Sequence, residues 1–570
     1  QVGVIEAGPY VAPGSDPRID LISQYGAAFR DPALDWGLKT VPQKGLNGRV
    51  IDETVAKVLG GSSMICDVLW QRASREEYDS WGTVLGNGPS WSFDALQPYF
   101  QKAENWTGPP PAVVPGAMDD LEGLKSSFGM DGPVQISYNS FYPDPIVPAV
   151  KAAHALGIRI NPNPNDGNAT GFSTPARAVD PRTGMRSSAV TAYFDSSSDR
   201  PNLLVLTGAQ ATKVLFSEGD DDGDGKKATG VQFLYESKEH TAKVTREVIL
   251  SAGTFKTPQL LELSGIGNRV LLEHLGIKTV VDLPGVGENL QDQTYTLSDV
   301  VLKPGSLTLD HMRFNLTFLQ RQQDQFDADR TGALTYDTAV TGSTPMKSFL
   351  SDADLSVLSS TMPSTTNPSL SPLQKIQFNL LHSFFREGKI GWAEFLMYAG
   401  GGAASIPEPD TPYNTPIVFH LYPFARGSVH VNTKDPLASP VIDPQYFSHD
   451  FDVTMHALST AWLRTWMQTA PMAALVDRIN APSETDVKTP TEWEHYVRGN
   501  AIVSTLFPLC PRRPRAPLTR FDSVYWRLET DDIPSSRYVG TTSGPPSSLR
   551  LECLLASRLF FFSTAFIELV

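Results

Sequence analysis

Two periods of apolar residues alternate along the first half of the chain, one typical of strands and one typical of helices. Continuous or period-two apolar runs predict strands over 1–6, 49–59, 202–207, 211–216 and 244–252. Apolar residues at helical spacing predict helices over 90–104, 147–156, 186–194 and 254–263. Because a strand, a glycine turn and a helix follow one another at 244–263, we expect a doubly wound α/β domain.

The second half of the chain has a looser pattern. Mixed aromatic, serine and glycine segments extend from about 296 to 415; then 417–431 alternates as strands do, and 452–467 has helical spacing with a tryptophan-rich face. A chain of 570 residues is too long for a single hydrophobic core. We therefore expect a second domain that supplies one wall of a pocket.

Charge and composition limit the classes of partner. A net charge of −15 and a pI near 5.2 argue against nucleic-acid binding, so we expect a small-molecule partner. The apolar segment 554–570 carries Arg558 and Glu568, and we expect no membrane span. The ten histidines form no recognised ligand motif, so we also expect no metal site.

Three glycosylation sequons begin at Asn105, Asn168 and Asn315, and they favour a secreted glycoprotein. The chain begins without a signal peptide, which is either absent or already removed. Three cysteines are too few for a disulfide scaffold. Nothing in the pattern indicates an oligomeric state.

Two features near the N-terminus point to a nucleotide cofactor. Gly60, Gly61, Ser62 and Ser63 would let a ligand approach the backbone, and the amides and hydroxyls there can donate to a phosphate or a ring heteroatom. An ordinary turn is the alternative interpretation. Glu6 ends the first strand, where a carboxylate can accept hydrogen bonds from ribose hydroxyls. A surface glutamate that caps a strand is the alternative there.

Two stretches resemble the signatures of the glucose-methanol-choline (GMC) oxidoreductases. Residues 56–65 resemble the first signature, and 253–267 fit the second at every constrained position. The resemblance covers residues 2 to about 496 and is greatest for the fungal glucose oxidase and aryl-alcohol oxidase branch. It implies FAD as the cofactor, hydride transfer from an alcohol carbon to the flavin, and reoxidation by oxygen or a quinone.

The resemblance also implies roles for individual residues. Glu6 looks like the carboxylate that binds the ribose of FAD. The turn over the flavin and its diphosphate looks like Gly60, Gly61, Ser62 and Ser63. Ala211 would offer its backbone to the adenine. The partner would be a sugar or an aryl or aliphatic alcohol.

Three departures from the family pattern affect these expectations. The family's opening strand and its Gly-x-Gly-x-x-Gly loop are missing, and Cys66 stands where the first signature has Asn or His, which we interpret as a small buried thiol. The family's His-Pro motif, which carries the base, is replaced by Ser504–Pro508, and no histidine follows His495. The catalytic residue is therefore unknown, and 497–570 looks like an out-of-frame or unspliced tail.

Together these observations predict an α/β fold (α+β overall). A doubly wound FAD-binding domain is expected over 1–105 and 186–295, without its N-terminal strand and loop, and a substrate domain on an antiparallel sheet over 106–185 and 296–496. The aberrant tail would replace the catalytic segment. The expected function is FAD-dependent oxidation of an alcohol to a carbonyl compound. A catalytically silent relative, a truncated or mis-spliced product, and an FAD-containing hydroxynitrile lyase are the alternatives.

Overall fold

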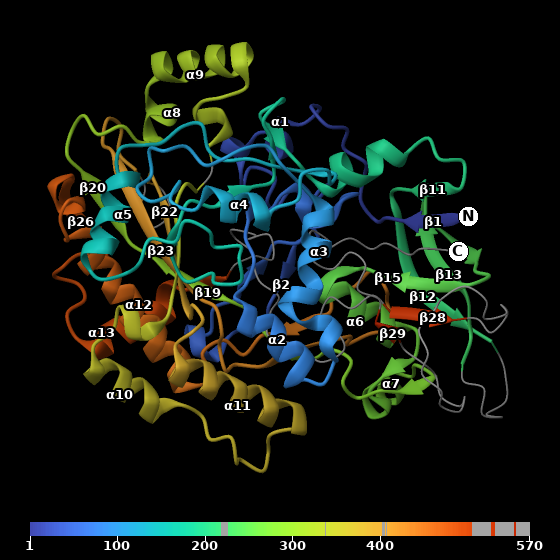
Figure 1. Cartoon of the computed structure of the whole chain (residues 1–570). Coiled ribbons are helices and arrows are strands. Elements are labelled where there is room, and N and C mark those ends of the chain that lie inside the picture. Colours follow the sequence, from blue (N-terminus) through green and yellow to red (C-terminus); the bar gives the residue numbers. More distant parts are fainter. Residues whose placement is uncertain are drawn as a thin grey trace.

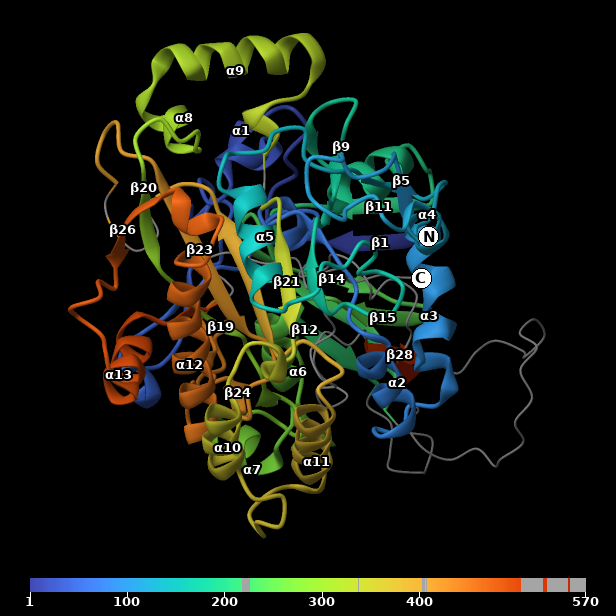
Figure 2. The ribbon, with the colours of Figure 1, turned by 60° about the vertical axis from the view of Figure 1, so that its left-hand side comes forward.

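The computed structural model shows a protein of mixed helices and sheets (Figures 1 and 2). It describes residues 1–217, 226–336, 338–401, 405 and 407–503, and the backbone of 526–529 and 552–553. A large antiparallel sheet lies on the left of Figure 1, and the N-terminal strand with the strands beside it lies on the right. Most of the predicted aberrant tail therefore falls outside the described residues. In the described part, no helix is long and apolar enough to cross a bilayer.

The first strand, β1 (Val2–Ile5), pairs in parallel with β11 (Leu203–Leu206), as the α/β prediction requires. Their apolar side chains join a core with the antiparallel strands β12 (Ala209–Phe216), β13 (Ala228–Tyr235) and β14 (Lys238–Lys243). The prediction of a strand over 49–59 is wrong. Only the short strand β3 (Asp52–Glu53) forms there, and it pairs with β2 (Leu38–Lys39). After β3 the pairing continues only as an isolated bridge between Asp35 and Ala56, and an apolar run alone does not distinguish such irregular pairing from a regular strand.

The strand β15 (Glu247–Leu250) leads directly into α6 (Gly253–Leu263), as the strand, turn and helix pattern predicts. All residues of α6 except Thr254 are buried, so this helix lies inside the molecule rather than on its surface. The backbone of β28 (Trp526–Glu529) pairs antiparallel with β15, and β29 (Glu552–Cys553) pairs with β28. A second parallel pair, β16 (Ile266–Gly267) and β17 (Val281–Asp282), follows α6.

The predicted second domain on an antiparallel sheet is confirmed. Its eight strands run in the order β26-β20-β23-β22-β21-β7, with β19 pairing β23 and β27, and every pairing is antiparallel. The strands are β7 (Gly171–Ser173), β19 (Thr294–Leu297), β20 (Asp299–Leu302), β21 (Thr341–Thr344), β22 (Ala393–Tyr398), β23 (Tyr413–His420), β26 (Val476–Ala481) and β27 (Ile502–Val503).

The predicted helix over 452–467 is α12 (Asp450–Met467), which packs against β23 and α5 (Ile146–Ala155). The indoles of Trp462 and Trp466 stack, and Trp466 Nε1 donates to the carbonyl of Ala149 at 2.9 Å. The tryptophan-rich face therefore joins helix and sheet in the largest core of the molecule. The other helices on this side are α8 (Asp310–Phe314), α9 (Leu316–Asp329), α10 (Asp352–Thr361), α11 (Pro372–Glu387) and α13 (Pro490–Asn500).

One predicted helix is shorter than expected. The segment 186–194 begins with β10 (Met185–Arg186), paired with β9 (Val179–Asp180), and only Val190–Phe194 is helical, as a single π turn. Tertiary pairing outweighs the local apolar spacing at this position. The remaining helices are α1 (Pro17–Asp20), α2 (Arg75–Thr83), α3 (Phe93–Ala103), α4 (Leu121–Ser127) and α7 (Arg269–His274). The remaining strands are β4 (Leu69–Trp70), β5 (Glu104–Trp106), β6 (Val134–Ile136), β8 (Ala176–Arg177), β18 (Glu288–Leu290), β24 (Gly427–His430) and β25 (Val441–Asp443).

Candidate cofactor site

Glu6 lies at the carboxyl end of β1, the place where an open α/β sheet binds its ligand. Its Oε1 accepts a hydrogen bond from the Gly8 amide at 2.7 Å, whereas Oε2 is buried and has no hydrogen-bond partner among the described residues. Burial raises the pKa of this carboxyl to about 7, against the smaller opposing effects of the Gly8 amide and the Lys57 charge. A buried acceptor without a donor is costly, so Oε2 is suited to a ligand hydroxyl.

The glycine turn lies directly against the end of β1. The Leu59 amide donates to the Pro9 carbonyl at 2.9 Å. A Cβ atom added to Gly8 would lie 2.0 Å from the Lys57 carbonyl oxygen, so only glycine permits this approach of the two backbones. The structure therefore brings together Glu6 and Gly60, which are more than fifty residues apart in the sequence.

The predicted turn residues form a rigid, largely buried corner. Gly60 has φ 92° and Gly61 has φ 57°, and a 3-10 turn follows over Gly61–Met64. The Ser63 hydroxyl donates to the Gly60 carbonyl at 2.6 Å and accepts from the Ala189 amide at 3.0 Å. Ser62 Oγ accepts from the Ala56 amide at 3.3 Å. The hydroxyls thus hold the turn itself. A Cβ atom added to Gly60 would lie 2.9 Å from Val190 Cγ2, so glycine is also required by the packing around the turn.

Ala211 lies on β12 near the same strand end. The Ala209 amide donates to the Glu6 carbonyl at 2.8 Å, which ties the start of β12 to the end of β1. The pairing of β12 with β13 shifts register between Ala211 and Lys213, and such a bulge disrupts the hydrogen-bond ladder. The proposed contact of Ala211 with adenine stays a prediction.

Two further residues complete what we call the cradle, defined as Glu6, Gly60, Gly61, Ser251 and Asn289. Asn289 is 6% exposed with φ 63°, and neither polar atom of its side chain has a hydrogen-bond partner in the described part of the chain. The Ser251 hydroxyl, just before α6, is also buried, and no described residue forms a hydrogen bond with it. An apolar cluster that contains Trp36, Val55, Phe255 and Leu290 packs the segments after Ser251 and Asn289 against the segment that leads into the glycine turn. Sequence reasoning missed Asn289, because its positive φ and its burial are visible only in the structure.

Cys66 is 1% exposed, but it is disulfide-bonded and is therefore not the free thiol that we expected. Its carbonyl accepts from Arg186 Nη1 at 2.5 Å. Arg186 also donates to the Ser63 carbonyl at 3.3 Å and to the Ile19 carbonyl at 3.0 Å. Arg186 therefore holds the backbone that follows the glycine turn, at Ser63 and Cys66, against the backbone of Ile19.

All ten histidines lie in the described residues. His420 and His456 are fully buried near Trp392, Asp452 and Phe447 of the second domain, and burial lowers the pKa of His456 to about 3. His495 is exposed on α13. The role of the catalytic base therefore stays unassigned. Within the described ranges, no cluster of three metal-ligating side chains occurs.

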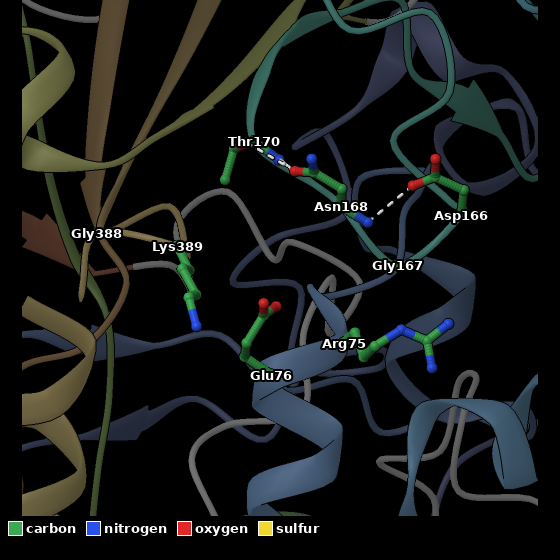
Figure 3. Close-up of a pocket in the computed structure, with 8 residues that line it drawn as sticks. All are labelled: Arg75, Glu76, Asp166, Gly167, Asn168, Thr170, Gly388 and Lys389. Atoms are coloured by element: carbon green, nitrogen blue, oxygen red, sulfur yellow. Dashed lines mark hydrogen bonds between the residues drawn. The ribbon is translucent and has the colours of Figure 1, made fainter.

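Figure 3 shows a polar hollow of about 410 Å³, and none of the predicted site residues lines it. Its lining comes from the start of α2, the loop 166–170 and the residues that follow α11: Arg75, Glu76, Asp166, Gly167, Asn168, Thr170, Gly388 and Lys389. Asn168 belongs to a sequon, and its Oδ1 accepts from the Thr170 hydroxyl at 2.7 Å. Glycosylation and secretion stay predictions.

His430 links three elements beside the cradle and should make stability depend on pH. Its Nδ1 lies 2.7 Å from Glu262 Oε1 on α6, and its Nε2 lies 3.1 Å from Glu288 Oε1 on β18. Burial opposes the charged ring, but the two carboxylates outweigh burial and raise the pKa of His430 to about 9. The charged ring therefore adds stability that is complete below the unfolded pKa of about 6.5 and is lost as pH rises through 9.

We expect His430→Gln to lower the free energy of unfolding by roughly 1–2 kcal/mol at pH 6, after allowance for solvent screening. The difference from the unchanged protein should shrink towards zero by about pH 10. Urea unfolding of both proteins at several pH values measures it. A difference that stays constant from pH 6 to 10 would contradict a charged His430.

Three features are typical of a two-domain protein with a nucleotide cofactor. They are a carboxylate at a strand end, where a ribose can bind, a glycine turn beside it, and a second domain on an antiparallel sheet. The chain belongs to the GMC oxidoreductase family, whose N-terminal domain profile matches residues 23–295 and whose C-terminal domain profile matches 423–509. The family resemblance is thereby confirmed. GMC oxidoreductases are FAD-binding flavoproteins, so the prediction of FAD is confirmed at the level of the family.

Known proteins agree with this assignment. A dehydrogenase of Armillaria gallica is 38% identical over 505 residues, which are 86% of this chain and 77% of the relative. A solved FAD-dependent oxidoreductase from Chaetomium thermophilum superposes with a TM-score of 0.77 at 27% identity, covering 88% of this chain and 83% of its own. A solved fungal aryl-alcohol oxidase has a TM-score of 0.72 at 25% identity, covering 88% and 84%.

Proposed function

We propose that this protein binds FAD in the cradle and oxidises the CH–OH group of a small alcohol to a carbonyl group. The observation that carries the proposal is the buried, unpaired Oε2 of Glu6 at the end of β1. Family membership supports the reaction class, and the names of relatives, among them choline dehydrogenases, support an alcohol as substrate.

The residues of the cradle fit the parts of the cofactor. Glu6 would accept hydrogen bonds from ribose hydroxyls, which suits a carboxylate that already holds one amide and has one oxygen free. Asn289 offers one donor and one acceptor to a polar edge such as that of the flavin ring. When bound, FAD would supply the two-electron acceptor for a hydride. The turn at Gly60 would let its backbone approach the cofactor closely.

The test is FAD binding by the full-length protein with Glu6→Gln. Charge-assisted hydrogen bonds contribute about 1.5–3 kcal/mol each, so Kd for FAD should rise by roughly 10- to 100-fold. Quenching of flavin fluorescence on titration measures this. Glu122→Gln is the control, because Glu122 is 85% exposed on α4 and should bind FAD like the unchanged protein.

The chemistry is tested separately on the FAD-loaded protein. Anaerobic addition of sugars and of aryl and aliphatic alcohols should bleach the flavin absorbance with at least one substrate, and oxygen or a quinone dye should restore it. A protein that binds FAD tightly yet is bleached by no alcohol would support the catalytically silent alternative. Release of cyanide from hydroxynitriles without bleaching would support the lyase alternative.

A further inference from the structure

Two lysines beside the cradle form no ion pair with any described residue. The ammonium of Lys256 lies 4.4 Å from the centre of the Trp36 ring, and the ammonium of Lys57 lies 5.0 Å from the same centre. Lys256, in the first turn of α6, is only 9% exposed. Within the described part of the chain neither ammonium makes an ion pair or a hydrogen bond. Both lie over the indole, and the Lys57 charge also acts at longer range on the Glu6 carboxyl and on Lys256.

This arrangement is unfavourable unless an anion joins it. A buried ammonium loses its hydration, and a cation–π contact returns only part of that cost. The second positive charge of Lys57 adds repulsion, and burial together with this neighbour lowers the pKa of Lys256 to about 8. A methionine or leucine would fill the same space without either cost. The two charges therefore point to a ligand that carries negative charge.

The position of the lysines indicates which part of a dinucleotide they would meet. The Lys57 backbone packs against Gly8, two residues after Glu6, and the Lys57 charge acts on the Glu6 carboxyl. In a dinucleotide, the phosphates are attached to the ribose whose hydroxyls Glu6 would hold. Ser251, with its unpaired buried hydroxyl, precedes α6 and adds a neutral donor near Lys256.

We propose that Lys57 and Lys256, arranged around Trp36, form the site that holds the diphosphate of FAD. This inference rests on the proposed function and adds two residues to it. Lysine binds phosphate as a compact point charge, and a dianionic diphosphate would neutralise both ammonium groups at once. A free phosphate ion has the same chemistry, so the experiment must separate it from the cofactor.

Lys256→Met is the main test, because methionine keeps the length of the side chain and its contact with Trp36 but removes the charge. For the full-length apoprotein, Kd for FAD should rise about 10- to 100-fold, while binding of riboflavin, which has no phosphate, should stay unchanged. The salt dependence of FAD binding should also decrease. Lys213→Met, at an exposed position of β12, should change none of these quantities.

A second measurement separates a binding role from a structural one. If Lys256 is kept for an anion, Lys256→Met should leave the melting temperature of the apoprotein unchanged or raise it, because an unpaired buried charge is removed. The rise in melting temperature that saturating FAD produces should become smaller. A lower melting temperature of the apoprotein with unchanged Kd for FAD would mean a structural lysine and would overturn the proposal.

Other outcomes distinguish this inference from the proposed function. If Glu6→Gln weakens FAD binding but Lys256→Met and Lys57→Met do not, the assignment of the diphosphate site to the lysines is wrong. The proposed cofactor site around Glu6 is then still supported. Inorganic pyrophosphate could raise the melting temperature of the unchanged protein but not of Lys256→Met, while Kd for FAD is the same in both. The site would then bind a free anion only, and the assignment to FAD would be wrong. If FAD binds to none of the proteins, the proposed function itself fails.

Discussion

Replacing Glu104 with alanine is expected to lower the free energy of unfolding by about 3–5 kcal/mol. Glu104 and Arg72 are both fully buried, and Arg72 Nη2 donates to the two carboxylate oxygens at 2.9 and 2.8 Å. The carboxylate also accepts from Trp70 Nε1 at 2.8 Å and from the Gly129 amide at 3.1 Å. The alanine variant would leave the Arg72 guanidinium buried without its counter-charge.

Urea unfolding of the purified proteins measures this loss of stability. The free energy of unfolding of Glu104→Gln should lie between those of the unchanged protein and Glu104→Ala, because glutamine keeps the shape of the side chain but not its charge. Glu273→Ala is the control. Glu273 pairs with Arg269 at 3.7 Å on the exposed surface of α7, so its removal should cost at most about 0.5 kcal/mol. Equal losses for Glu104→Ala and Glu273→Ala would show that the buried pair adds no stability.

Gly8→Ala is expected to abolish measurable FAD binding, with Kd raised at least about 100-fold. The added Cβ would lie 2.0 Å from the Lys57 carbonyl oxygen and 2.4 Å from the Val58 amide nitrogen. Both contacts are with backbone, so no side-chain rotation relieves them, and the end of β1 must move away from the glycine turn. Glu6, two residues earlier, would then lose its position relative to Gly60.

The matched control is Gly499→Ala on α13, where an added Cβ meets nothing within 4 Å. Alanine favours a helix over glycine by about 0.5–1 kcal/mol, so this variant should be slightly more stable and should bind FAD normally. Circular dichroism checks that Gly8→Ala is folded. A folded Gly8→Ala protein with unchanged FAD affinity would mean that the contact between β1 and the turn does not shape the cofactor site.

The apolar pattern by itself determined the elements whose burial is local and regular. The strand before Glu6, the succession of β15 and α6, and the helix α12 follow directly from periodicity, because one face or one continuous run must be buried. The glycines at 60 and 61 were also readable, since few other residues tolerate a positive φ in a buried turn. Antiparallel pairing in the second domain came from the family resemblance.

Only the tertiary structure decided which distant polar groups meet. Arg72 and Glu104 are 32 residues apart, and the lysines that share the Trp36 ring are separated by most of the first domain. Periodicity indicates which side of an element is buried, but it carries no information about the partner on the other side. The same reason explains the failure over 49–59, where only a two-residue strand and an isolated bridge pair with 34–39. Unpaired atoms such as Glu6 Oε2 become visible only when every neighbour is known.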